Sequence, residues 1–157
     1  MAEFGYDAAQ TLAPGQAAIL ENLYPCTRRP QNVLHENLSP IFNLRGNPMV
    51  MGCNCNVPDA QYLVKYSGNI AVPTGGTVGE IQLALSVNGQ ILPLTIAAAT
   101  PAAVEQFWHV SGEKTIRVPA GCCPSVSVVN ASVSADGTTP APTLVVRNLN
   151  VPVVRTA

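Results

Sequence analysis

The run Gly79-Glu-Ile-Gln-Leu-Ala-Leu-Ser-Val-Asn-Gly89 carries the clearest structural signal in the chain. Its large apolar residues occupy every second position: Ile81, Leu83, Leu85 and Val87. A period of two places these side chains on one face of a β-strand and the small or polar ones on the other. Asn88-Gly89 follows at once, and this pair favours a type I′ hairpin turn because both residues accept positive φ. The sequence therefore predicts a half-buried strand that turns back on itself.

Similar short apolar segments follow one another on both sides of this run. We expect strands over residues 60–72, 90–96, 104–110, 114–118, 125–129 and 143–155. Pro93 argues for an edge position or a bulge in the second of these, and Thr100–Glu105 is the one place where a short helical turn is expected. Seven or eight strands at a spacing of about 8–12 residues indicate an all-β fold, an antiparallel jelly-roll sandwich.

Residues 1–47 differ from the rest because their apolar residues show no sustained period. Prolines interrupt this segment about every ten residues, which blocks any long helix. We expect an extended N-terminal arm with short strands near 17–24 and 41–45, laid over the main domain or a neighbour. The chain then divides into an arm, 1–47, and a jelly-roll β-sandwich domain, 48–157.

The charge content excludes some partners and suggests others. Eight Lys and Arg stand against nine Asp and Glu, so the formal net charge is −1, and only 11% of residues are charged. Typical domains contain about 25% charged residues. We therefore expect no nucleic acid and no membrane as partner, and a surface partly covered by copies of the chain or by another protein. The N-terminus has no secretion signal pattern, and no apolar stretch approaches the length of a membrane span.

The cysteine count is odd, and three interpretations stay open. The cysteines are Cys26, Cys53, Cys55, Cys122 and Cys123. They are small buried or half-buried strand residues, or they form disulfides after release into an oxidising medium, including between subunits. In the third interpretation they supply thiolates to a metal, although the paired C-x2-C spacing of zinc ribbons is missing. We predict a possible disulfide among these five cysteines.

No catalytic motif stands out. The nine acidic residues show no suggestive pairing, His35 and His109 are the only imidazoles, and no G-x-S-x-G elbow exists. The glycine-rich 74–79 segment lacks the Lys-Ser/Thr of a phosphate loop, so we expect a hairpin loop. We predict no enzyme activity, no cofactor and no metal. The aromatic pair Phe107-Trp108 is more typical of a core or subunit interface than of a ligand platform.

From Tyr62 to the C-terminus, roughly two-thirds of the chain, several motifs point to a known family. They are Tyr62-x-Val64-x-Tyr66, Pro73-Thr-Gly-Gly-Thr-Val-Gly79, Ile81-x-Leu83-Ala-Leu-Ser-Val-Asn-Gly89, Thr100-Pro-Ala-Ala-Val104, Val118-Pro-Ala-Gly-Cys-Cys123, Val126-Ser-Val-Val-Asn130 and Val153-Val-Arg-Thr156. With these motifs the chain resembles small all-β proteins of prophages in gut Bacillota. That family looks like the jelly-roll heads of the tumour-necrosis-factor and complement type, which also cap collagen-like filaments of the Bacillus exosporium.

The resemblance implies a homotrimer on an external surface, as a phage capsid decoration or head-fibre protein without catalytic residues. It would be made in the host cytoplasm and would bind the major capsid protein or another virion protein on the capsid exterior. The residues expected to dock on that partner are Phe4, Tyr6, Leu12, Ile19, Leu20, Arg28 and Arg29. Those expected at the subunit interface are Tyr62, Val64, Tyr66, Phe107 and Trp108.

Two other functions remain open. The chain could be a subunit of a bacterial surface or spore appendage, with its cysteines linking the polymer. It could also be a carbohydrate- or receptor-binding module that uses Trp108 and nearby polar groups. The virion structural role is the first hypothesis, because it accounts for both the low charge and the irregular N-terminal segment.

Overall fold

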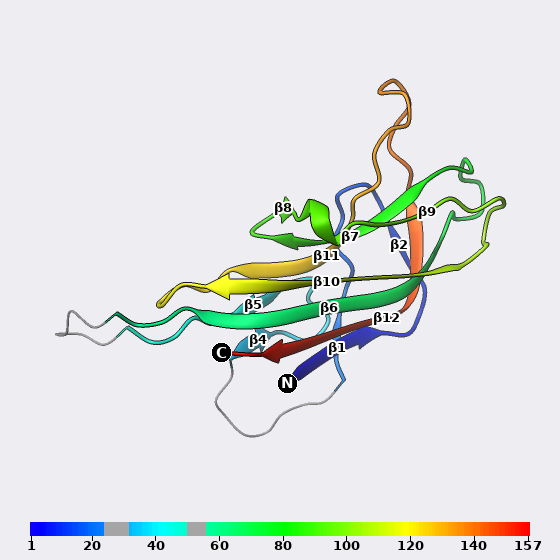
Figure 1. Cartoon of the computed structure of the whole chain (residues 1–157). Helices are drawn as coiled ribbons and strands as arrows, with labels where there is room; N and C mark the ends of the chain where they lie inside the picture. The colour runs from blue at the N-terminus through cyan, green and yellow to red at the C-terminus, as the bar shows by residue number, and fades with distance from the viewer. Residues whose placement is uncertain (24–31, 50–55) are drawn as a thin grey trace.

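Two antiparallel sheets of six strands each form the fold of this chain in a computed structural model, which describes residues 1–23, 32–49 and 56–157. In Figure 1 the sheets lie as two layers, and the described residues include one short 3-10 helix. The strands of each sheet come from all parts of the chain, so the chain passes repeatedly from one layer to the other. The predicted all-β class, an antiparallel jelly-roll sandwich, is confirmed.

The first layer, sheet A, has the strand order β10 (Trp108–Val118), β6 (Ala60–Ala71), β12 (Leu144–Arg155), β1 (Ala2–Tyr6) and β3 (Glu21–Asn22), with β2 (Gln10–Leu12) paired to β12. The second layer, sheet B, has the order β4 (Val33–His35), β5 (Phe42–Leu44), β11 (Ser125–Asn130), β7 (Ile81–Val87) and β8 (Gln90–Ile91), with β9 (Ala97–Ala99) paired to β7. The helix η1 (Pro93–Thr95) connects β8 to β9. One edge of the sandwich is thus formed by β10 of sheet A beside the β8–η1–β9 segment of sheet B.

The strand predicted from the alternating run is present as β7, and its apolar residues face the core. Asn88 and Gly89 have φ values of 49° and 79°, and β8 pairs back onto β7. Both turn residues therefore adopt the left-handed conformation that the Asn-Gly pair predicts.

Three local predictions are wrong, and the first two errors meet at one place. Residues 104–110 and 114–118 belong to a single strand, β10, which continues past Gly112. A Cβ on Gly112 would lie 2.6 Å from the Tyr66 ring and 2.8 Å from the Thr95 carbonyl oxygen, so this glycine makes room for close packing. Residues 90–96 contain η1 instead of a full strand, because Pro93 lacks an N–H and the Thr95 hydroxyl accepts the hydrogen bond of the Leu85 amide (2.9 Å). The helical turn expected over Thr100–Glu105 is absent from the described structure.

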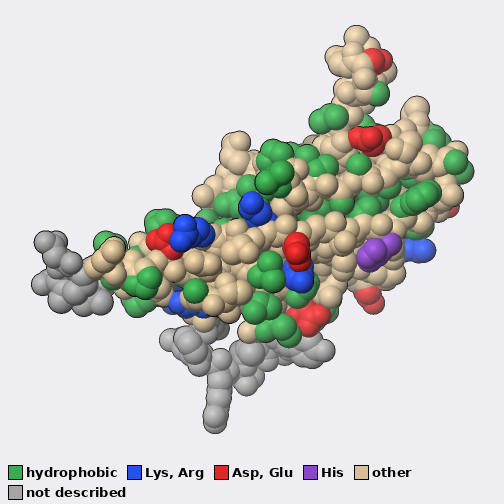
Figure 2. Space-filling view, viewed as in Figure 1, with side chains coloured by type: hydrophobic (Ala, Val, Ile, Leu, Met, Phe, Trp, Pro, Cys, Tyr) green, Lys and Arg blue, Asp and Glu red, His purple; other side chains and the backbone are tan. Residues whose placement is uncertain are grey.

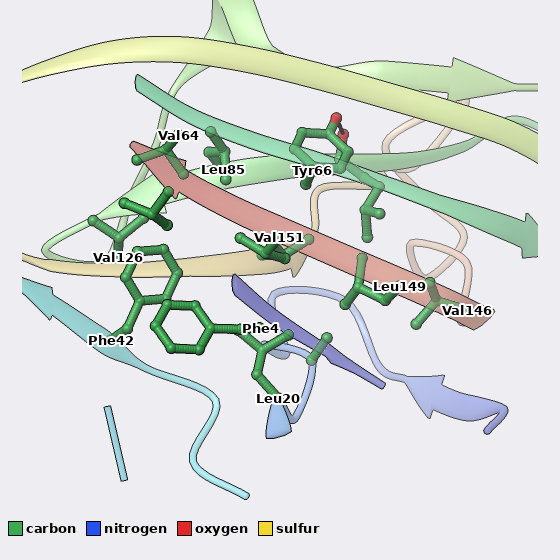
Figure 3. Close-up of a cluster of buried hydrophobic side chains, with 14 of the residues drawn as sticks. Phe4, Leu20, Phe42, Val64, Tyr66, Leu85, Val126, Val146, Leu149 and Val151 are labelled. Atoms are coloured by element: carbon green, nitrogen blue, oxygen red, sulfur yellow. Dashed lines mark hydrogen bonds between the residues drawn. The ribbon is translucent and has the colours of Figure 1, made fainter. Parts of the chain in front are cut away.

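The N-terminal segment is part of both sheets, which corrects the expected arm and the division at residue 47. Its described residues contribute β1, β2 and β3 to sheet A and β4 and β5 to sheet B. All five residues of β1 pair with β12. The rings of Phe4 and Phe42 lie 5.1 Å apart inside the sandwich (Figure 3), and both are buried. Strands of two to five residues are too short to show a period, so the sequence pattern did not reveal them.

Two buried polar side chains connect distant parts of the fold. The Tyr66 hydroxyl on β6 lies 2.8 Å from the Leu83 carbonyl oxygen and 2.6 Å from that of Thr95, which links sheet A to sheet B. The Asn130 amide on β11 donates to the carbonyls of Leu12 (2.9 Å) and Pro142 (3.1 Å). The Asn130 amide has two N–H donors and can serve both of its carbonyls, whereas the single Tyr66 proton is donated to one of its two.

Candidate functional site

Large apolar side chains are exposed along the border of the two sheets, where β10 lies beside η1 and β9. We call it the apolar edge; its exposed side chains are Ile91 (39% exposed), Leu94 (84%), Ile96 (39%) and Trp108 (49%). The local structure explains the exposure. The Thr95 side chain is buried, and its hydroxyl accepts a hydrogen bond from the Leu85 amide. The side chains of its neighbours Leu94 and Ile96 are therefore exposed. Figure 2 shows hydrophobic side chains gathered over η1 and along the border toward the loops.

The outer face of sheet A adjoins this edge and is more polar. On β6 and β10 the side chains that point away from sheet B are mainly polar or charged, and they include Lys65, Ser67, Asn69, His109, Ser111 and Glu113. The Lys65 ammonium lies 3.0 Å from the Glu113 carboxylate, and this is the one ion pair among the described residues. Both side chains are half-exposed or more, so water screens the pair and its contribution to stability is small.

Three of the predicted interface residues lie inside the chain's own core. Tyr62, Val64 and Tyr66 are on the inner face of β6 and are at most 1% exposed. The Tyr62 hydroxyl lies 3.0 Å from the Asn32 carbonyl oxygen and 2.5 Å from that of Arg45, so its single proton is donated to one or the other. Their side chains therefore do not reach a second subunit. A period of two separates the faces of a strand but does not tell which face the other sheet covers.

The two aromatic residues of the predicted interface are placed differently. Trp108 is half-exposed and belongs to the apolar edge. Phe107 is half-buried beneath the guanidinium group of Arg147, which lies 3.8 Å from the ring centre. Sequence reasoning found Trp108 but missed Ile91, Leu94 and Ile96, for which the position of Pro93 was the only signal.

The predicted docking residues are also largely internal. Phe4, Leu12 and Leu20 are between 0% and 4% exposed, so they cannot be presented to a capsid. Tyr6 is half-buried and Ile19 is 40% exposed. Arg28 and Arg29 lie outside the described residues. The apolar residues of the N-terminal segment thus complete the core instead of forming a separate docking element.

Two of the five cysteines, Cys122 and Cys123, lie within the described residues. Cys122 and Cys123 are exposed and form no disulfide within the described residues. They line an open cavity of about 430 Å³ together with Arg45 and Arg155. Cys26, Cys53 and Cys55 lie outside the described residues, so a disulfide that involves them stays a prediction. Among the residues that the structure describes, no group of three or more His, Cys, Asp and Glu side chains is arranged to hold a metal ion.

Three titratable groups of the described residues have clearly shifted pKa values, and each shift has a structural cause. Burial raises the pKa of Tyr62 and Tyr66. Hydrogen bonds from Thr139 and Thr138 hold the pKa of the Asp136 carboxyl well below its usual range, in the loop that projects beyond the sheets (Figure 1). Tyr62 and Tyr66 belong to the core, and Asp136 belongs to an exposed loop. No helix of the described residues is long and apolar enough to cross a bilayer.

Comparisons with known proteins support the fold alone. No family model matches the sequence, and no curated protein matches it. The Eiger TNF of S. frugiperda superposes with a TM-score of 0.62 at 12% identity, over 99% of this chain and 91% of the other. Murine APRIL (TM-score 0.48, 10% identity, 94% and 98% covered) and the globular domain of the zebrafish complement 1qA protein (0.34, 13%, 96% and 94%) are less similar. The chain therefore has a jelly-roll fold similar to that of a TNF protein.

Proposed function

We propose that the chain is a trimeric structural subunit on the outside of a phage capsid, a decoration or head-fibre protein. The observation that carries the proposal is the apolar edge: four large side chains are exposed along one border of the sandwich. Removing such a side chain from water contributes about 1.5–3 kcal/mol. A surface of this kind is typical of a protein that is covered by copies of itself.

The geometry of the sandwich favours a closed ring. The apolar edge and the outer face of sheet A lie side by side on one chain, because both include β10. A copy therefore cannot cover its own edge, and in the proposed ring a different surface of the next copy covers it. Contacts between two different surfaces close into a ring when the rotation between copies is a simple fraction of a turn. Three copies is the number that the family resemblance implies.

Light scattering coupled to size-exclusion chromatography tests the assembly. We expect the wild-type protein to have three times the mass of one chain at micromolar concentration. The double variant Leu94→Glu/Trp108→Glu is expected to elute as a folded monomer, because two carboxylates would be buried without partners at the contact.

Val133→Glu is the matched control, since Val133 is 64% exposed on the projecting loop and lies outside the apolar edge. This variant is expected to remain trimeric, and circular dichroism should show that all variants are folded. A wild-type monomer, or a double variant that still assembles, would contradict the proposal.

The capsid role needs a separate experiment. We expect mass spectrometry of purified virions, induced from the strain that carries the gene, to find the chain at a copy number comparable with that of the capsid subunits. Partial digestion of intact particles should remove it before the major capsid protein, because it lies outside. If the chain is absent from the particles, the capsid role is rejected, but the proposed trimer is not.

A second candidate is a subunit of a cross-linked surface or spore appendage. The exposed adjacent thiols of Cys122 and Cys123 favour it, since neither is enclosed by the fold. In that case non-reducing gels of native material should show covalent multimers that Cys122→Ser/Cys123→Ser abolishes. A single band without reductant would reject the cross-linked appendage and not the virion protein.

A further inference from the structure

A cavity of about 440 Å³ lies at the end of sheet A where β6 ends and β10 begins. Aliphatic side chains form one part of its lining, among them Ala9, Ala71 and Val145. The remaining part is formed by Glu105, Phe107 and Arg147. The cavity thus presents one cation and one anion over a small apolar floor, and it is separate from the apolar edge described above.

Arg147 is held ready for a ligand in this cavity. Its guanidinium lies over the Phe107 ring at 3.8 Å from the ring centre, and such stacking fixes the plane of the group. Within the described residues it makes no ion pair, and its N–H groups have no hydrogen-bond partner. A planar guanidinium with free donors matches the two oxygens of a carboxylate.

Glu105 faces the same cavity from a strained backbone position. Its φ is 56°, in the left-handed region that is uncommon for a residue other than glycine, and its amide donates to the Val72 carbonyl (2.8 Å). The Thr74 hydroxyl donates to Oε1 of the Glu105 carboxylate (2.6 Å), which leaves the second carboxylate oxygen without a partner among the described residues. Strained residues of this kind gather at ligand sites. Asn148, with φ 52°, is a second one, directly after Arg147 at an irregularity of β12.

Further polar groups continue the site along the outer face of sheet A. Asn69 pairs in register with both Arg147 and His109, so the three side chains form one row across β12, β6 and β10. Figure 2 shows a histidine next to a basic side chain at this end of the face. The row adds an amide and an imidazole beside the guanidinium, each of which exchanges hydrogen bonds with hydroxyl groups.

We propose that this cavity binds an acidic sugar residue, a uronic or sialic acid, through its carboxylate. Arg147 binds the carboxylate with two parallel hydrogen bonds, Glu105 and Asn69 bind sugar hydroxyls, and the aliphatic floor contacts the C–H face of the ring. A neutral sugar leaves the guanidinium without its anion. Nucleic acid carries many phosphates, and a chain of net charge −1 offers them no general electrostatic attraction beyond this one guanidinium, so nucleic acid is disfavoured.

Chemical-shift titration of the isotope-labelled full chain tests this site. We expect glucuronate and N-acetylneuraminate to saturate at millimolar concentrations and to shift the amides of 145–148 and of Phe107, whereas glucose has no effect. Arg147→Gln is expected to weaken binding about tenfold or more. Arg147→Lys should recover only part of the loss, because an ammonium cannot bind both carboxylate oxygens in a plane.

Arg117→Gln is the matched control, because Arg117 is an exposed arginine at the far end of β10, and it should bind as the wild type does. Equal binding of glucose and glucuronate, tighter binding of a free amino acid such as β-alanine, or an unchanged affinity of Arg147→Gln would each overturn the proposal. Failure to saturate with either acid would overturn it as well. The titration does not depend on assembly, since the monomeric Leu94→Glu/Trp108→Glu variant retains all the residues of the cavity.

Discussion

Replacing Phe4 with alanine is expected to lower the free energy of unfolding by about 3–5 kcal/mol. Phe4 is 4% exposed, and its ring packs against the rings of two residues of sheet B, Phe42 (ring centres 5.1 Å apart) and His35 (4.6 Å). Alanine removes this contact and leaves a cavity between the layers that the short strands around it cannot close. Denaturant titration at one fixed protein concentration measures the effect, because association adds to the apparent stability.

The control for this variant comes from the same N-terminal segment. Leu38 is 53% exposed, so Leu38→Ala is expected to change the stability by less than about 0.5 kcal/mol. If the N-terminal segment were an arm that only covers the sandwich, Phe4→Ala and Leu38→Ala would both lower the free energy of unfolding only slightly. A loss below about 1 kcal/mol for Phe4→Ala would therefore contradict the packing described here.

Replacing Tyr66 with phenylalanine is expected to cost about 1–3 kcal/mol at neutral pH. The ring remains in place, but the carbonyl oxygens of Leu83 and Thr95 lose the hydroxyl that lies within 2.8 Å of both. Tyr6→Phe is the control, because the Tyr6 hydroxyl makes no hydrogen bond within the described residues. It should unfold at the same denaturant concentration as the wild type.

The Tyr66 hydroxyl also predicts how stability changes at alkaline pH. Burial raises the pKa of Tyr66 in the folded state, whereas an unfolded tyrosine ionises near about pH 10. The neutral form is thus favoured by folding, and its contribution is complete below about pH 10 and is lost as the pH rises further. The stability difference between wild type and Tyr66→Phe should shrink across this range. A difference that stays constant or grows would show that the hydroxyl is not buried in this way.

The long strands illustrate what could be predicted without a structure. β6 and β7 each contain seven residues or more, and a strand covered on one side must alternate apolar and other side chains over that length. The Asn88-Gly89 turn was equally visible, because few residue types tolerate positive φ at two successive positions. Both features depend on residues that are close together in the chain, so both can be predicted from the sequence.

The interaction sites were harder to predict. Trp108 is a candidate interface residue by its residue type alone. Leu94 is a candidate only because the neighbouring Thr95 side chain is buried in the core, which leaves Leu94 exposed. Phe107 and Arg147 stand forty residues apart in the chain, and their stacking depends on three strands lying in the order β10–β6–β12. No spacing rule brings such residues together.

By itself the sequence determined the class of this protein: alternating apolar residues, frequent turns and few charges require β-sheets with a covered surface. Only the tertiary structure decided which side of each strand is covered, that the described part of residues 1–47 adds strands to both sheets, and that the apolar edge and the Arg147 cavity are distinct surfaces. The physical reason is that alternation is a property of one strand, whereas burial depends on the layer that packs against it, and that layer is built from residues far away in the chain.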